Sequence, residues 1–329
     1  MLAQHISAEQ DANQDKIANP LNIRVFAFQP NDDFYSFPFE KRLKILEEQI
    51  LLAKKSMQQE VISDTEQQIK NSHGNGKKSA RFWVKNKINS FSRALKDKTS
   101  TAASANAIPL PPSPPSALFV APEYLFKDLS ELCYRRYYTQ QQKNEFKNKL
   151  KELSIGTDML IVPGTICWYK NAKSDPHPYY RNTAYFFYQG EVQKYKKKHP
   201  HTSYDFDYTD EGFLNFMDLR RVYFKSGQYD DPIKDFLGCK IGVEICLDSV
   251  YGSLFSLKKT LCIQLIIADG AKNFIPVNQE GVLLIKLERN KIETEIGRIK
   301  INTAENDKVE LEPAIPLEIG ADLTGFQFK

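Results

Sequence analysis

The chain has 329 residues, 41% of them hydrophobic and 12% aromatic, which is enough to bury a large core in one large or two medium domains. Its first 22 residues are polar and of mixed charge, and no run of about twenty apolar residues follows, so a cleavable secretory signal and a membrane-spanning helix are not expected. We expect a cytoplasmic protein, with secretion that needs no cleavable signal left open.

The five cysteines are an odd number and show no CxxC or histidine-rich spacing. This pattern argues against a disulfide framework and against a zinc site, so free thiols in a reducing compartment are expected. No metal or organic cofactor is expected. The cysteines are Cys133, Cys167, Cys239, Cys246 and Cys262.

The chain opens with a strand pattern followed by a helix pattern. Residues 23–29 form a short apolar run that stops at a Pro-Asn pair, which predicts a buried strand and a turn. Residues 40–57 carry apolar positions at helical spacing and predict an amphipathic helix. A strand followed by a helix is the start of an α/β layer pattern.

Residues 58–113 depart from this pattern and are interpreted as an insertion that ends in a Pro-rich linker. Between Lys77 and Lys98, eight Lys or Arg stand against one Asp, a local charge of +7, so the remaining residues sum to 4 − 7 = −3. Apolar residues recur there at intervals of 4, 3 and 4, which predicts a basic amphipathic helix. These residues are Val84, Ile88, Phe91 and Leu95.

Three roles for this basic helix stay open. The simplest is a helix docked on the body of the protein, with its lysines in water. The other two are binding to a membrane surface and binding to an acidic partner through Lys77 to Lys98. Nucleic acid is disfavoured because no recognised motif accompanies the charge. Because the insertion follows a helix and precedes a strand, we expect it at the end of the sheet opposite the site, with a role in localisation or assembly.

The second half of the chain continues the alternation. Strands are predicted at residues 117–122, 159–169, 182–190, 239–245 and 261–271, the third closed by a Gln-Gly turn. Helix patterns occupy residues 128–153 and 250–261. Several of the strands are apolar throughout, which indicates an α/β sheet covered on its faces.

Reactive side chains lie just after three of these strands, where an α/β sheet binds its ligands. Glu123 follows the strand at 117–122, Cys246 follows the strand at 239–245, and Lys197 lies in a basic run after the strand at 182–190. A helix amino end and a nearby cation are expected to lower the pKa of such a thiol. Taken singly, the cysteine also fits a core residue, the lysine a solvated surface and the glutamate a helix-start charge.

Taken together, three segments resemble the motifs of the nitrilase (carbon-nitrogen hydrolase) superfamily. LFVAPEYLF is similar to the first motif with Glu123, RNTAYFFYQGEVQKYKKKHP to the second with Lys197, and GVEICLD to the third with Cys246 and Asp248. The intervals, 197 − 123 = 74 and 246 − 197 = 49, are also similar. The resemblance covers residues 23–271 apart from the insertion at 58–113.

The resemblance implies an α+β fold of four layers, the αββα sandwich. It places a nitrilase-like catalytic domain at residues 23–329, behind a polar tail at 1–22 and interrupted by the helical, basic insertion. It also implies a homodimer that pairs sheets across its interface. After residue 270 the family's long helix has no counterpart, and residues 281–301 look like two terminal β-segments, so we expect a shortened C-terminal part.

The resemblance further implies a set of catalytic roles. Cys246 would be the nucleophile, Glu123 the base, and Lys197 the cation that, with the N–H of Leu247, holds the developing oxyanion. Some members carry a second carboxylate in a Glu-Gly-aromatic context, which Glu211 resembles. The implied reaction is hydrolysis of a small amide, with nitriles, carbamoyl compounds and acyl transfer left open. The alternatives are a catalytically silent binding scaffold, or a membrane- or partner-binding protein that acts through the insertion.

Overall fold

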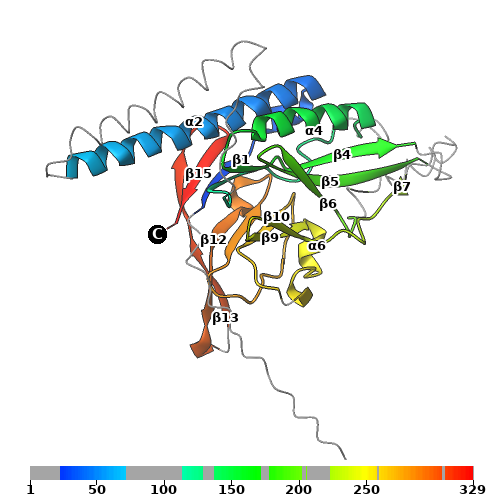
Figure 1. Ribbon diagram of the computed structural model, residues 1–329. Coiled ribbons are helices and arrows are strands. Elements are labelled where there is room, and N and C mark those ends of the chain that lie inside the picture. The colour runs from blue at the N-terminus through cyan, green and yellow to red at the C-terminus, as the bar shows by residue number, and fades with distance from the viewer. Residues whose placement is uncertain are drawn as a thin grey trace, which may run out of the picture.

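The computed structural model describes residues 23–71, 113–128, 137–171, 178–201, 205, 223–257, 259–305 and 308–328. In this part of the chain the strands form two sheets, and two long helices lie outside the first of them (Figure 1). The expected mixed α/β sandwich is confirmed.

Within the described residues the first sheet holds nine strands, seven of them in the order β14-β15-β1-β2-β3-β5-β4, with β6 and β7 added on β5. β1, β2 and β3 are parallel neighbours, so their carboxyl ends meet at one edge. The strands are β1 (Arg24–Phe28), β2 (Ala117–Val120), β3 (Met159–Val162), β4 (Thr165–Lys170), β5 (Tyr179–Tyr188), β6 (Glu191–Lys196), β7 (Tyr223–Phe224), β14 (Ile315–Glu318) and β15 (Leu323–Gln327).

The second sheet has the order β13-β12-β11-β10-β9-β8, and β9, β10 and β11 are parallel. The carboxyl ends of these strands are tied to those of the first sheet by two hydrogen bonds. The N–H of Glu123 donates to the carbonyl of Ala268, and the side chain of Gln29 donates to the carbonyl of Glu288. The strands are β8 (Ile233–Phe236), β9 (Cys239–Ile245), β10 (Ile263–Ile267), β11 (Leu283–Leu287), β12 (Glu295–Asn302) and β13 (Lys308–Pro313).

The core follows the alternation of side chains along each strand. Val25 and Ala27 of β1 belong to the apolar cluster that also contains Ile241 and the other inward residues of β9, so this cluster fills the space between the sheets. Phe26 and Phe28 belong to a second cluster with the helices. Both faces of the middle of the first sheet are therefore buried, which explains why β2 and β3 are apolar throughout.

Two long helices cover the outer face of the first sheet. α2 (Phe39–Asn71) confirms the helix predicted at 40–57 and extends it, and its buried apolar residues recur at intervals of 4, 3, 4 and 3. α4 (Gln140–Ser154) begins at a capping box between Thr139 and Gln142, which satisfies two N–H groups of the first turn. The buried apolar residues described in α2 are Phe39, Leu43, Leu46, Ile50 and Ala53.

The helix predicted at 250–261 is wrong. The chain forms only the single turn α6 (Leu247–Val250), followed by turns and the short 3-10 segment η5 (Phe255–Leu257). The N–H of Leu254 donates to the side chain of Glu244 at 3.1 Å instead of to a helix carbonyl, and Leu254 packs where a Cβ on Gly242 would lie. Burial of this leucine on a glycine of β9 therefore replaces the helix, and short turns form this part of the fourth layer.

The single strand predicted at 159–169 is two strands. β3 and β4 are separated by Pro163 and Gly164, and Gly164 has a φ of +66°. A Cβ at Gly164 would lie 2.1 Å from the carbonyl oxygen of Pro122, so the turn requires glycine at this position. The turn packs directly against the residue that precedes Glu123.

The remaining strand predictions are confirmed. β1, β2, β5, β9 and β10 lie at the predicted places, and the turn after β5 has positive φ at Gln189 and Gly190. The two terminal β-segments correspond to β11 and β12. After β13 the chain crosses at Ala314 into the first sheet, where β15 pairs antiparallel with β1.

The predictions for the polar tail and for most of the insertion, including the basic helix between Lys77 and Lys98, lie outside the described residues. β2 begins at Ala117, so the described end of the insertion enters the sheet at the edge opposite Glu123. In the described parts of the chain, no helix combines the length and apolarity that a membrane span requires.

Candidate active site

Cys246 lies at a strained turn between β9 and α6. Its φ of 48° and ψ of −106° are rare for a residue with a side chain, and its N–H donates to the carbonyl of Ile267 at 2.9 Å. The next amide, Leu247 N–H, has no hydrogen-bond partner in the described part of the chain. The turn thus holds a thiol beside an available backbone donor.

Glu123 reaches this thiol from the first sheet. Its N–H donates to the carbonyl of Ala268 at 3.3 Å, which ties the ends of β2 and β10 together, and the N–H of Tyr124 donates to Thr165 Oγ1 at 2.9 Å. The side chain of Glu123 is fully buried. It lies near enough to Cys246 for its charge to raise the pKa of the thiol.

Lys197 follows β6 and is also fully buried. Its N–H donates to the backbone oxygen of Asn182 at 3.0 Å. Its ammonium contacts Glu123 Oε1 at 2.8 Å, Asp205 Oδ2 at 2.6 Å and the hydroxyl of Tyr124 at 3.3 Å. The three residues expected from the sequence, Glu123, Lys197 and Cys246, are therefore brought together.

Two further residues complete the polar cluster and had no assigned role in the sequence analysis. Asn182 of β5 donates from Nδ2 to Glu123 Oε1 at 2.7 Å, so it orients the carboxylate and the lysine backbone at once. Asp205 accepts from Lys197, from the hydroxyl of Tyr124 at 2.8 Å and from the N–H of His201 at 2.7 Å. Asn182 lies inside the second motif, whereas no motif surrounds Asp205.

The charges in this cluster are unbalanced when both carboxylates are ionised. Burial raises the pKa of Glu123 to about 7, against the lowering effect of Lys197, and the carboxylate of Asp205 raises it further. Burial disfavours the charged form of Lys197, but the two carboxylates outweigh it and raise its pKa well above the ordinary value. The cluster thus favours the charged form of Lys197 and shifts the pKa of Glu123 toward neutral pH.

One oxygen of Glu123 remains available. Oε2 is buried and makes no hydrogen bond of normal geometry within the described residues, whereas Oε1 is occupied by Lys197 and Asn182. A buried acceptor without a donor is unfavourable unless something approaches it. The acceptor that would receive the thiol proton is therefore in place.

The lowered thiol pKa expected from the sequence is wrong, because Cys246 is buried. Cys246 is only 7% exposed, and burial, followed by the charge of Glu123, raises its pKa above the ordinary thiol range. Lys197 and the backbone N–H of Asp269 lower it, but less. The resting group is a neutral thiol beside a base, not the thiolate expected from a helix end and a cation.

Asp248 holds the segment around Lys197 onto the turn around Cys246. Its buried carboxylate accepts from the hydroxyl of Tyr195 at 2.9 Å and from the N–H groups of Lys198 and His199 at 3.1 Å and 2.8 Å. It also accepts from the N–H of Ile245 at 3.3 Å. This explains the aspartate of the third motif in terms of geometry.

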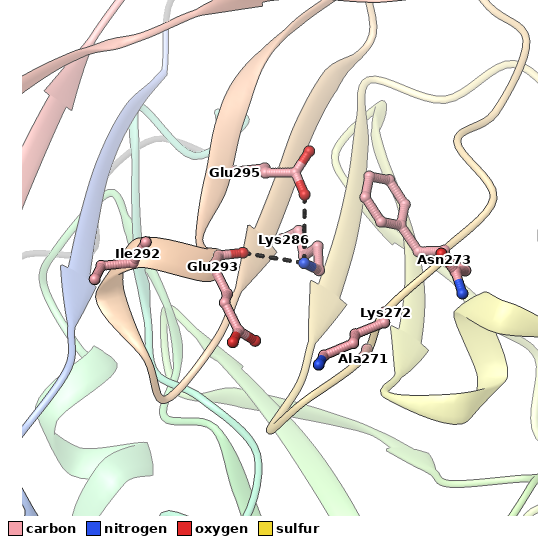
Figure 2. A pocket seen from close by; sticks show the side chains of 8 residues that line it. Ala271, Lys272, Asn273, Lys286, Ile292, Glu293 and Glu295 are labelled. Atoms are coloured by element: carbon pink, nitrogen blue, oxygen red, sulfur yellow. Dashed lines mark hydrogen bonds and ion pairs between the residues drawn. The ribbon is translucent and has the colours of Figure 1, made fainter.

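The second carboxylate assigned from the resemblance, Glu211, lies outside the described residues, so that prediction stays a prediction. Among the described residues no group of three or more His, Cys, Asp or Glu side chains has an arrangement that would hold a metal ion. A cavity of about 540 Å³ is lined by eight residues that include neither Glu123 nor Cys246 (Figure 2). They are Ala271, Lys272, Asn273, Phe274, Lys286, Ile292, Glu293 and Glu295.

No family model and no curated protein sequence matches the chain. Among solved structures it is similar to an amidase from Nesterenkonia sp., with a TM-score of 0.46 and 12% identity over 94% of this chain and 92% of that chain. It is also similar to Saccharomyces cerevisiae Nit3, a member of branch 10 of the nitrilase superfamily, with a TM-score of 0.36 and 16% identity over 72% of this chain and 80% of that chain.

A third similar structure is XC1258 from Xanthomonas campestris, a CN-hydrolase superfamily protein with an arsenic adduct in the active site. It has a TM-score of 0.35 and 12% identity over 72% of this chain and 82% of that chain.

Proposed function

We propose that the chain hydrolyses a carbon-nitrogen bond outside peptides, in an amide, through a thioester on Cys246. The observation that carries this proposal is the buried pair of Glu123 and Lys197, in which one carboxylate oxygen is occupied and the other is free beside a thiol. A buried ion pair gives little net stability, so its presence beside a strained cysteine is better explained by chemistry than by folding.

The first half of the reaction uses all three groups. The sulfur of Cys246 attacks the amide carbon while its proton passes to Glu123, and the C–S bond forms as the carbonyl becomes an oxyanion. The unpaired N–H of Leu247 and the ammonium of Lys197 stabilise this oxygen. Of the three contacts of Lys197, that to Tyr124 is the longest at 3.3 Å and is the one that a substrate oxygen would replace.

The second half returns the enzyme to its starting state. Glu123 gives its proton to the departing nitrogen, the C–N bond breaks, and ammonia or an amine leaves a thioester behind. Water then loses a proton to Glu123 and attacks the thioester carbon. The C–S bond breaks to release the acid, and the proton passes from Glu123 to the sulfur, which restores the thiol and the carboxylate. Nitriles and carbamoyl compounds fit the same three groups, so they belong in the substrate screen.

The experiment is a screen of short linear amides, nitriles and N-carbamoyl compounds for ammonia release, with hydroxylamine added to intercept the thioester as a hydroxamate. The wild-type protein should form ammonia and hydroxamate from at least one class, and Cys246→Ala should form neither. Cys167→Ser is the matched control, because Cys167 is also fully buried near the site but lies on β4. Activity that survives in Cys246→Ala would refute the proposal, and a protein inert to all classes would favour the silent scaffold.

A further inference from the structure

The bend at residues 269–271 continues the segment that holds Cys246 and Glu123. The carbonyl of Ile267, at the end of β10, accepts from the N–H of Cys246 at 2.9 Å, and the carbonyl of Ala268 accepts from the N–H of Glu123 at 3.3 Å. Gly270 has a φ of +91°, so the backbone turns sharply just after these two residues. The positions of the two carbonyls therefore depend on what holds the bend.

A single buried carboxylate holds it. Glu288, the residue after β11, is fully buried, and its Oε2 accepts from the N–H of Gly270 at 2.6 Å while its Oε1 accepts from the N–H of Ala271 at 3.1 Å. Two successive N–H groups that converge on one anion form a rigid arrangement, and each bond is strengthened by the charge.

Glu288 is itself fixed from three sides. Its N–H donates to Thr294 Oγ1 at 3.2 Å, and its carbonyl accepts from Nε2 of Gln29, which follows β1, at 2.7 Å. Lys286 lies 3.4 Å from Oε1 and bridges to the backbone of Glu293 and the side chain of Glu295 (Figure 2). The backbone of Glu288 is thus tied to both sheets, and Lys286 holds its carboxylate.

We infer that Glu288 is a positioning residue for the reaction, which fixes the bend at 269–271 so that the carbonyls of Ile267 and Ala268 hold Cys246 and Glu123 beside each other. This inference rests on the proposed function, since it concerns the same thiol. Proton transfer from the thiol to Glu123 depends on the distance between the two groups, so a displaced bend slows it. A carboxylate is required, because a glutamine offers one acceptor oxygen and turns an N–H₂ toward the second backbone donor.

Strand β9, which pairs with β10, carries a residue that serves as a matched control. Glu244 is also fully buried, and its two oxygens accept from the N–H of Leu254 at 3.1 Å and from Nε2 of Gln264 at 3.0 Å. Burial raises the pKa of Glu244 as it does that of Glu288. Glu244 makes these contacts away from Cys246, so the two carboxylates differ mainly in what they hold.

The test compares Glu288→Gln and Glu244→Gln by the rate at which iodoacetamide alkylates Cys246, measured by peptide mass between pH 5.5 and 9 in a Cys262→Ser background. Both variants should lose thermal stability. Only Glu288→Gln should slow the alkylation at pH 7, by about five- to tenfold for one lost hydrogen bond, and should move the pH–rate curve to higher pH. Glu288→Asp, which keeps the charge but draws the oxygens back, should fold and show the same direction of change.

Equal rates and equal pH–rate curves in Glu288→Asp and the wild-type protein would overturn the inference, as would an equal slowing in Glu244→Gln. The proposed function fails in a different way. If Cys246 of the wild-type protein reacts no faster than Cys167, the thiol is not activated at all. An activated wild-type thiol that is indifferent to Glu288 would refute the positioning role alone.

Discussion

The carboxylate of Asp248 accepts the backbone N–H of His199 at 2.8 Å and lies 3.0 Å from Nδ1 of the same residue. Asp248 comes two residues after Cys246, and His199 comes two residues after Lys197. This contact therefore sets the position of the Lys197 segment relative to the Cys246 turn. A buried carboxylate thus joins the two sheets at the candidate site.

Asp248→Asn should disturb both segments. An amide has one acceptor oxygen for a position that now receives four N–H or O–H donors, so the unfolding free energy should fall by about 2–4 kcal/mol and amide turnover by at least tenfold. Asp235→Asn is the control, because Asp235 accepts the Gly238 N–H in an exposed turn. Urea unfolding and turnover measure the two effects, and a fully active Asp248→Asn would contradict the anchoring role.

Gly164→Ala tests the support behind Glu123. Both Gly164 and Gly156 have a φ of +66°, but a Cβ at Gly156 meets nothing within 4 Å, whereas one at Gly164 would overlap the oxygen of Pro122. Gly156→Ala should cost about 1–2 kcal/mol from backbone strain alone. Gly164→Ala should cost about 1–3 kcal/mol more and should also slow alkylation of Cys246, because the turn before Glu123 must move. Equal behaviour of the two variants would show that the packing does not matter.

Lys197→Ala tests the charge balance of the site. It leaves Glu123 and Asp205 buried together without a cation, so the protein should lose about 3–5 kcal/mol of stability at pH 8. The loss should be smaller at pH 5, where a carboxylate can take up a proton. Adding Asp205→Asn should recover part of the stability without restoring turnover. If Lys197→Ala alone were as stable as the wild-type protein, a buried charged cluster would be contradicted.

Because the pKa of Glu123 is raised, kcat/KM and stability should change in opposite directions as the pH rises. Catalysis needs the ionised base, so kcat/KM should rise with pH along an acid limb centred at about pH 7. Because the folded pKa lies above the ordinary value of 4.5, the folded state holds the proton more tightly, and stability should fall as pH rises from 4.5 to about 7.

Glu123→Gln should abolish turnover. It should also remove the part of the pH dependence of stability that Glu123 contributes. Burial also raises the pKa of Glu244 to about 7, so Glu244→Gln should flatten the stability curve in the same interval while turnover remains. Unfolding midpoints at pH 5 and pH 8 with turnover at each pH separate the two carboxylates. An acid limb below pH 5 would show that Glu123 is not the titrating base.

The sequence predicted the parts of this molecule that depend on local pattern. Apolar runs located β1, β2, β5, β9 and β10, and the three motifs located Glu123, Lys197 and Cys246. The predictions for residues 159–169 and 250–261 were wrong because contacts between residues distant in the sequence decide the structure there. The strand breaks between β3 and β4 because Gly164 lies against the oxygen of Pro122. Turns and the short η5 segment replace the predicted helix after α6 because Leu254 is buried on Gly242.

The same limit applies to the site. Asp205 and Glu288 carry no local signal, since each acquires its role only when the fold brings it to Lys197 or to the bend at 269–271. The raised thiol pKa was missed because strand and helix ends were considered without the desolvation that accompanies full burial. Burial is a property of the whole fold, and a motif does not report it.

A competing thiol must be removed before the reactivity of Cys246 is measured. Cys262 is half-buried, and its hydrogen bond with the thiol of Cys239 lowers its pKa to about 6, so it would be alkylated readily without any catalytic role. Cys262→Ser removes this background. Cys167, whose pKa burial raises, then serves as an internal reference for an inert buried thiol.

The most direct measurement is the rate of Cys246 alkylation by iodoacetamide at pH 7.5 in the Cys262→Ser protein, with and without Glu123→Gln. A thiol that hands its proton to Glu123 should react at least tenfold faster than Cys167 and should lose most of this advantage in Glu123→Gln. A Cys246 that reacts at the rate of Cys167, or at the same rate with and without the glutamate, would contradict the account of a base-activated nucleophile.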